Sequence, residues 1–345
     1  MNVFWTILIK SIEKERIDNM SISYNLIYPI ILFFSLIITA TVEKKIIPIL
    51  LGKAKQPIYE DGPSWHMEKA GTPTMGGLAF ILAGIFCLVL CLVFHRYFYS
   101  YNESLLSVII SIIFAISNGL VGAFDDFTKI KRNHNQGLTP FEKLFFQFML
   151  TTIFLMARSY LFHDSTKIDL FLFNVDLGIL YYPIAILLIV GIINFANLTD
   201  GIDGLAATVA FGIGISFFFI FHSSVPEAAI LSLLIIGISL GFLIFNIHPA
   251  KIFMGDTGSL FLGALAVSCA FSGKSPTLII PIGAVYVMEG ISVILQVIVY
   301  KTTKKRLFKM APLHHHLEKC KMSENKICIV ALICTLLISV IINIL

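Results

Sequence analysis

Long apolar blocks alternate with short polar segments over most of the chain. An α-helix needs about 20 apolar residues to cross the hydrocarbon core of a bilayer, which is about 30 Å thick. Strands of a membrane barrel would alternate apolar and polar residues, whereas these blocks are continuously apolar. The pattern predicts transmembrane helices over ten ranges, which are 24–41, 76–94, 105–123, 144–161, 178–195, 205–222, 227–246, 258–273, 277–299 and 327–345.

Composition supports the same fold class. Of the 345 residues, 57% are hydrophobic and only 13% are charged, and the mean hydropathy is +0.89. Such a chain has too little polar surface to coat a water-soluble globule. We predict an all-α, polytopic integral membrane protein with about ten transmembrane helices, made of an N-terminal extension (1–23) and one transmembrane domain (24–345).

The first residues carry a short apolar piece and then mixed charges, without a small-residue cleavage site. This pattern argues against a cleaved signal peptide. Either Met1 or Met20 could be the first residue of the protein.

The distribution of lysine and arginine predicts the orientation in the membrane. Ten spans place both termini on one side, and 18 of the 25 lysines and arginines belong to the loops of the other side. The positive-inside rule assigns this second side to the cytoplasm. Because the formal net charge is only +4, we interpret the basic residues as topology signals and expect no nucleic-acid partner.

Five polar clusters contain residue types that carry out chemistry, and all five lie in loops predicted to face the cytoplasm. They are SWHMEKAGTPTMGG (64–77), FDDFTKIK (124–131), NLTDGIDG (197–204), MGDTGS (254–259) and PLHHHLE (312–318). Since the clusters share one side of the membrane, we predict a single active-site cleft at the cytoplasmic surface.

Two pairs of aspartates stand out in these clusters. The adjacent carboxylates of Asp125 and Asp126 would repel by about 4 kcal/mol at about 4 Å and an effective dielectric constant of about 20, so they require a cation, a lysine or a shared proton. The spacing of Asp200 and Asp203 places both on one face of a helix, beside glycines that let a ligand approach. The structural alternatives are charges at a helix end and an N-cap.

Asp256 stands in a glycine-containing turn that leads into an apolar block. Such a turn presents backbone N–H groups to a phosphate, and Asp256 could hold the metal that a phosphate requires; a capped helix start is the alternative. His314, His315 and His316 cannot all point in one direction. We therefore expect one or two imidazoles to face an anionic substrate, and no zinc site from this run alone; a solvated loop is the alternative.

Three further residues bear on the chemistry. Glu289 lies inside an apolar block, where an acid is costly, and both a hydrogen-bonding role between helices and a chemical role stay open. Lys69 and Lys129 could neutralise phosphate or mark the cytoplasmic side. Carboxylates, glycine turns and lysines at the edge of a helical body favour Mg²⁺-dependent handling of a diphosphate, with a lipid phosphate and a soluble nucleotide as the two substrates.

A family resemblance rests on five ordered motifs, which are GTPTMGG, FDDFTK, NLTDGIDGLA, FMGDTGSLFLG and APLHHHLE. From about Gln56 to Glu318 the chain is similar to the polyprenyl-phosphate N-acetylhexosamine-1-phosphate transferases, and within them it resembles the phospho-N-acetylmuramoyl-pentapeptide transferases of bacterial peptidoglycan synthesis. The resemblance implies transfer from UDP-N-acetylmuramoyl-pentapeptide to undecaprenyl phosphate, giving lipid I and UMP, with Mg²⁺ as cofactor. It also implies a homodimer in the bacterial cytoplasmic (inner) membrane.

The resemblance further implies roles for individual residues. Asp125 and Asp126 would activate or position the lipid phosphate, and Asp256 would bind Mg²⁺. The implied substrate-binding residues are Asn197, Asp200 and Asp203 in the nucleotide pocket, Lys69 and Thr74 near it, Phe253 stacked on uracil, and Lys129, His314, His315 and His316 at the phosphates or the sugar-peptide. Direct attack and a phosphoryl-aspartate on Asp125 or Asp126 both remain open.

Two alternative functions use the same sequence features. A sister transferase would take UDP-N-acetylglucosamine with the same lipid, and would differ in the loops that read the sugar. A secondary transporter would use an intramembrane acid such as Glu289 and glycine-broken segments, but the other carboxylates cluster at one membrane face.

Overall fold

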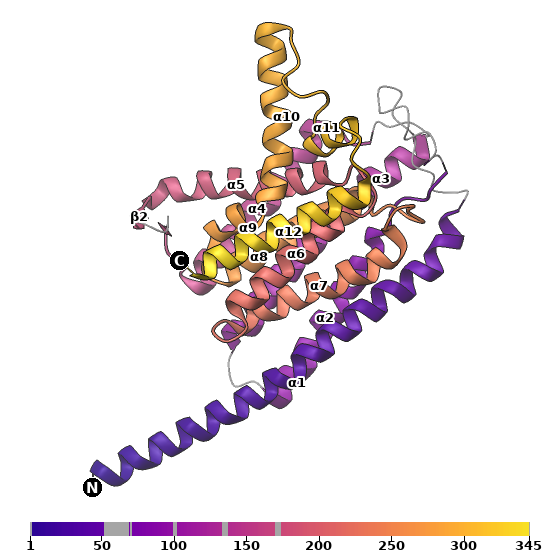
Figure 1. Cartoon of the computed structure of the whole chain (residues 1–345). Helices are drawn as coiled ribbons and strands as arrows, with labels where there is room; N and C mark the ends of the chain where they lie inside the picture. Colours follow the sequence, from indigo (N-terminus) through magenta and orange to yellow (C-terminus); the bar gives the residue numbers. More distant parts are fainter. Residues whose placement is uncertain are drawn as a thin grey trace.

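The computed structural model describes residues 2–51, 69, 71–98, 102–132, 137–169 and 174–344. These residues form a helical bundle with almost no strand (Figure 1). The α-helices are α1 (Asn2–Leu50), α2 (Gly77–Phe98), α3 (Asn102–Arg132), α4 (Pro140–Phe162), α5 (Tyr181–Thr199), α6 (Leu205–Phe221), α7 (Pro226–Asn246), α8 (Gly255–Ser272), α9 (Ile279–Ile282), α10 (Ala284–Thr303), α11 (Leu313–Lys319) and α12 (Glu324–Ile344). Two 3-10 helices, η2 (Gly178–Leu180) and η3 (Pro276–Leu278), precede α5 and α9.

Eight of the described helices are long and apolar enough to cross a membrane. This confirms the prediction of an all-α, multi-pass membrane protein. The count of ten spans stays a prediction, because α6 has only 17 residues and α8 begins with a polar first turn, Gly255–Ser259. The division at residue 23 also stays a prediction; α1 runs through that position without a break.

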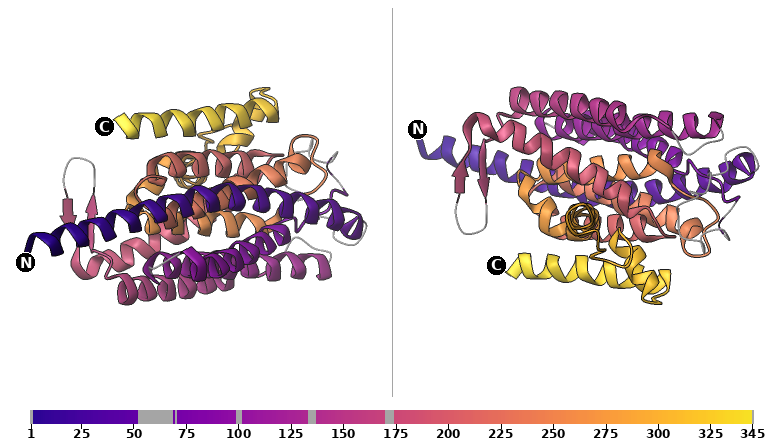
Figure 2. Two further views of the ribbon diagram at one scale, coloured as in Figure 1. Left: turned by 90° about the horizontal axis from the view of Figure 1, so that it is seen from below. Right: turned by 90° about the horizontal axis from the view of Figure 1, so that it is seen from above.

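The predicted block 277–299 is not a single helix, so this part of the prediction was wrong. α9 ends at Ile282 and α10 begins at Ala284. Pro281 has no backbone N–H to donate, and Gly283 separates the two helices. Figure 1 shows α10 rising away from the bundle, and in Figure 2 it is seen nearly end-on while α1 and α12 run across the view.

A small strand pair joins α4 to α5 and was not predicted. β1 (Lys167–Asp169) and β2 (Asn174–Asp176) are antiparallel, with Lys167 opposite Asp176. The pair lies near the end of the bundle where both termini are found (Figure 2). Because the termini share one end, the arrangement agrees with an even number of spans.

α8 forms the centre of the bundle, and its residues from Thr257 to Ser272 are all buried. Two glycines let neighbouring helices touch its first turn: a Cβ at Gly122 of α3 would overlap the backbone of Asp256, and a Cβ at Gly77 of α2 would overlap that of Gly258. The absence of a side chain at these glycines therefore brings the end of α3 against the start of α8. This contact places the acidic residues of both helices side by side.

We expect Gly122→Ala to destabilise the protein by about 1–3 kcal/mol, because the added methyl group must push α3 away from α8. The thermal unfolding midpoint of the purified protein in detergent measures this effect. Gly191→Ala is the matched control, since a Cβ at this helical position in α5 would meet nothing within 4 Å. Equal midpoints for the two variants would contradict the close approach.

Candidate active site

Polar side chains from separate segments of the chain surround one cavity of about 260 Å³. It lies at the end of the bundle away from the termini, where α3, α5, α8 and α11 meet (Figure 1). The lining residues are Thr74, Asp126, Lys129, Ile130, Asn197, Leu198, Asp200, Gly201, Gly255, Asp256, Pro312, His314 and His315. All five sequence clusters contribute at least one of them, as a single site requires.

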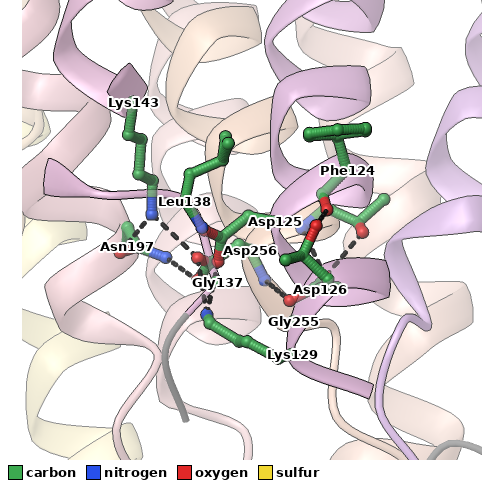
Figure 3. Close-up of polar contacts among 12 residues, drawn as sticks. Phe124, Asp125, Asp126, Lys129, Gly137, Leu138, Lys143, Asn197, Gly255 and Asp256 are labelled. Carbon is green, nitrogen blue, oxygen red and sulfur yellow. Dashed lines mark hydrogen bonds and ion pairs between the residues drawn. The ribbon is translucent and has the colours of Figure 1, made fainter. Parts of the chain in front are cut away.

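Asp256 has the densest set of partners in this cavity (Figure 3). Its Oδ2 atom accepts from the Nζ atoms of Lys129 at 2.9 Å and Lys143 at 2.8 Å. Its Oδ1 atom accepts from Nδ2 of Asn197 at 2.7 Å. Two lysines on one carboxylate supply the positive charge that burial of an acid demands.

Asp126 is bound to the first turn of α8. Its carboxylate accepts the backbone N–H of Asp256 at 3.1 Å, the N–H of Thr257 at 2.9 Å and the Thr257 hydroxyl at 2.6 Å. A carboxylate at a helix N-terminus satisfies free N–H groups and matches the helix dipole. Asp126 therefore caps α8 from a different helix and fixes the position of Asp256.

Asp125 has different partners from its neighbour. Its Oδ1 atom accepts the backbone N–H of Leu138 at 2.7 Å, and its Oδ2 atom lies 2.5 Å from Nζ of Lys129. A Cβ at Gly137 would overlap the Asp125 side chain, so the segment before α4 folds closely over this acid (Figure 3). Asp125 is only 2% exposed and lies behind the cavity wall.

Asp125, Asp126 and Asp256 could together hold a metal ion. Each offers a carboxylate oxygen, and the three oxygens lie within 4.8 Å of one another. Carboxylate oxygens are the ligands that hard cations such as Mg²⁺ prefer. The predicted repulsion between the acids is thus offset by lysines and by helix N–H groups, and a bound cation could offset it further.

Asp200 and Asp203 do not lie on one helix face, so that prediction was wrong. α5 ends at Thr199 and α6 begins at Leu205, with a turn between them. The turn ends at Gly204, whose φ of +81° favours glycine. The two acids consequently join different clusters.

Asp200 lines the cavity. Burial raises the pKa of its carboxyl well above the usual range, and the nearby carboxylates of Asp256 and Asp126 raise this pKa further. A cation that enters the cavity would relieve this repulsion.

Asp203 belongs to a second group of charged residues, the Asp203 cluster, which consists of Lys69, Asp203, His248 and Glu324. The Nζ atom of Lys69 lies 2.7 Å from Asp203 Oδ1 and 2.8 Å from Glu324 Oε2. Glu324 also accepts the backbone N–H of Asp203 at 2.7 Å, and Nδ1 of His248 lies 2.9 Å from Asp203 Oδ2. These contacts fasten the start of α12 to the turn between α5 and α6.

The three histidines diverge, as predicted. His314 and His315 line the cavity, and Nδ1 of His315 lies 2.6 Å from Glu318. His316 is outside the cavity lining; its Nδ1 atom accepts the backbone N–H of Lys309, and its ring packs edge-on against Phe308.

The structure brings most of the predicted site residues together. Those that line the cavity are Thr74, Asp126, Lys129, Asn197, Asp200, Asp256, His314 and His315; those that do not are Lys69, Asp125, Asp203, Phe253 and His316. Phe253 is half-buried, and its backbone pairs with Pro73 and Gly76. Residues 64–68 and 70 of the first cluster lie outside the described residues.

Sequence reasoning missed four residues. Lys143 and Thr257 contact Asp256 and Asp126, and His248 and Glu324 belong to the Asp203 cluster. Lys143 follows a capping box in which Thr139 and Glu142 start α4. The capping box predicts that a helix begins on the predicted cytoplasmic side. Lys143, in the first turn of that helix, could therefore have been expected near the clusters. Single residues such as His248 and Glu324 carry no comparable local signal.

Comparison with known proteins gives consistent matches. Residues 105–274 match the family Glycosyl transferase family 4, and residues 69–81 match Phospho-N-acetylmuramoyl-pentapeptide-transferase signature 1. The chain is 39% identical over 305 residues to the phospho-N-acetylmuramoyl-pentapeptide-transferase of Bacillus velezensis, covering 86% of this chain and 92% of the relative. It is also 39% identical over 299 residues to that of Halalkalibacterium halodurans, covering 86% and 90%, and over 295 residues to that of a Clostridium botulinum strain, covering 84% and 87%.

Lys143→Gln is expected to lower the stability of the folded protein by about 1–3 kcal/mol, because Asp256 loses one of its two cations in a buried setting. The thermal unfolding midpoint in detergent measures the loss. Lys131→Gln, an exposed lysine of α3, is the charge-matched control and should leave the midpoint unchanged. If both variants unfold at the wild-type temperature, the pairing of Lys143 with Asp256 is not a stabilising contact.

Proposed function

The chain belongs to the phospho-N-acetylmuramoyl-pentapeptide transferases, and from this premise we propose that it makes lipid I. The donor is UDP-N-acetylmuramoyl-pentapeptide, the acceptor is undecaprenyl phosphate, and the second product is UMP. One observation carries the proposal: a cavity with carboxylates and lysines at the end of a membrane bundle. Such a site can receive a phosphate on a lipid and a phosphate on a soluble nucleotide.

The reaction exchanges one diphosphate linkage for another. An oxygen of the lipid phosphate bonds to the phosphorus that carries the sugar, and the bond from this phosphorus to the bridging oxygen breaks. UMP leaves with the bridging oxygen and its electron pair. Because a phosphate monoester has a second pKa of about 6, the acceptor is already mostly dianionic at neutral pH, and little general-base help is required.

The lysines and acids of the cavity would have complementary tasks. Lys129 and Lys143 both form ion pairs with Asp256. When the substrates enter, the two lysines can form ion pairs with the substrate phosphates instead. Asp125 holds Lys129 from behind. Asp126 keeps the first turn of α8 in place. In this proposal Asp125 and Asp126 act mainly by holding other groups, although a phosphoryl-aspartate would use the same two residues.

The donor set at this cavity fits Mg²⁺. The three carboxylates of Asp125, Asp126 and Asp256 offer oxygen ligands within a small volume. We assign Asp256 as the main ligand, because it is the only one of the three that both lines the cavity and has no helix N–H group on its carboxylate among the contacts of the described residues. When bound, Mg²⁺ would offset the negative charge of the diphosphate and of the departing UMP.

The remaining substrate contacts are proposed from the family resemblance. Asn197, Asp200 and Asp203 would bind the nucleotide together with Lys69 and Thr74, and Phe253 would stack on uracil. His314, His315 and His316 would contact the sugar-peptide or its phosphates. Two observations support this arrangement: Asn197 donates a hydrogen bond to Asp256, and Asp200 lines the cavity.

We place the cavity on the cytoplasmic side of the bacterial inner membrane. The support is the excess of lysine and arginine in the loops at this end of the bundle. A homodimer is proposed from the family alone.

Release of UMP from the purified protein in detergent, with undecaprenyl phosphate and Mg²⁺, tests the proposed substrates. We expect release with UDP-N-acetylmuramoyl-pentapeptide and none with UDP-N-acetylglucosamine. Release with only the second donor would assign the chain to the sister transferases. A folded protein that releases UMP from neither would favour the transporter alternative.

Asp256→Asn is expected to lower Mg²⁺-dependent release of UMP at least about 100-fold, because the variant loses the charge that faces the cation. Asp176→Asn, in β2 at the other end of the bundle, is the matched control and should keep wild-type turnover. Near-normal turnover of the Asp256 variant would remove this residue from the metal site.

A further inference from the structure

A buried acid of α10 contacts the histidine segment that lines the cavity. Glu289 is 3% exposed and lies on the helix that leaves the bundle. Its two carboxylate oxygens accept the backbone N–H of His314 at 3.1 and 3.2 Å. Its Oε2 atom also lies 3.1 Å from Nδ1 of the His314 ring. One side chain therefore holds both the backbone and the ring of the same histidine.

The contact at Nδ1 bears on which nitrogen of His314 carries a hydrogen. A carboxylate that is ionised can only accept hydrogen bonds, and opposite such a carboxylate Nδ1 is the nitrogen that donates. The other nitrogen, Nε2, lies against Gly201, and both His314 and Gly201 line the cavity. A hydrogen bond at one ring nitrogen sets the role of the other, as in many histidine sites.

The Nε2 atom of His314 is a buried polar atom in need of a partner. The side chain of His314 is completely buried, and among the contacts of the described residues Nε2 has no hydrogen-bond partner. A Cβ at Gly201 would overlap this nitrogen, so glycine at 201 is what admits the ring. A buried polar atom without a partner is unfavourable, unless a ligand in the cavity pairs with it.

From this geometry we propose that Glu289 is a positioning residue for substrate binding. It holds His314 with Nε2 beside Gly201 at the cavity wall, where that nitrogen pairs with a polar group of the nucleotide-sugar. This inference rests on the proposed function and adds to it a residue far from the sequence clusters. A purely structural acid would need only the contact with the backbone. The contact with Nδ1 and the lack of a partner for Nε2 among the described residues indicate that Glu289 serves to orient the His314 ring.

The first test is the rate of UMP release by Glu289→Gln. Glutamine keeps the size and one acceptor oxygen, but its NH₂ group cannot accept from His314. We expect kcat to fall about 10- to 100-fold, with a thermal unfolding midpoint close to that of the wild type. Ser292→Ala is the matched control: Ser292 is buried on the same helix, and its hydroxyl donates to the backbone oxygen of Glu289 and not to the histidine. Wild-type kcat in Glu289→Gln would overturn the proposal.

A double-mutant cycle shows whether Glu289 acts through His314. His314→Asn keeps a donor towards Glu289 and removes the Nε2 atom that lies beside Gly201. We expect the double variant to be no slower than His314→Asn alone. Independent, multiplying losses in kcat would show that Glu289 acts by another route and would overturn the proposal.

A third readout does not depend on turnover and separates this inference from the proposed function. In ¹⁵N-histidine NMR spectra of the full-length protein, the His314 signal is the one that His314→Asn removes. We expect a hydrogen on Nδ1 in the wild type and a changed pattern in Glu289→Gln. A wild-type ring with its hydrogen on Nε2 alone would overturn the inference, even in an active enzyme. If the NMR result is as expected while no donor supports UMP release, the positioning contact stands and the proposed function fails.

Discussion

The structure depends on neutralising carboxylates that lie together, two of them buried and one half-buried, at one end of a membrane bundle. Asp125, Asp126 and Asp256 have oxygens within 4.8 Å of one another, and isolated charges in such surroundings would be strongly unfavourable. Each has a different source of compensation: a lysine and a backbone N–H for Asp125, the first turn of α8 for Asp126, and two lysines for Asp256. The site is therefore built by the same contacts that stabilise this end of the fold.

Packing and electrostatics depend on each other here. Gly122 lets α3 reach the backbone of Asp256, and one turn later Asp126 caps the helix that carries Asp256. The helix N-terminus gains an acceptor for its free N–H groups, while the acid gains donors. A change at Gly122 or at Asp126 would therefore alter the helix contact and the site together. The Asp203 cluster holds α12, and the contact with Glu289 holds α11, next to the same cavity.

The sequence was sufficient for the helical membrane fold, because each span is a continuous apolar block and needs no information from distant residues. It also marked the cavity, since five polar clusters fell on one predicted side. The spacing of Asp200 and Asp203 gave a wrong result, because a glycine turn interrupts the helix there. Glu324 could not be found by spacing: its partner Lys69 is 255 positions away, and only the packing of α12 brings the two together.

Direct binding of a divalent cation tests the central claim that these carboxylates form a metal site for phosphate transfer. Electron paramagnetic resonance can follow Mn²⁺, as a substitute for Mg²⁺, on the purified protein without nucleotide. We predict saturable binding that excess Mg²⁺ displaces and that is weakened in Asp256→Asn. Binding that never saturates, or that is the same in this variant, would contradict the assignment of the cluster as the metal site.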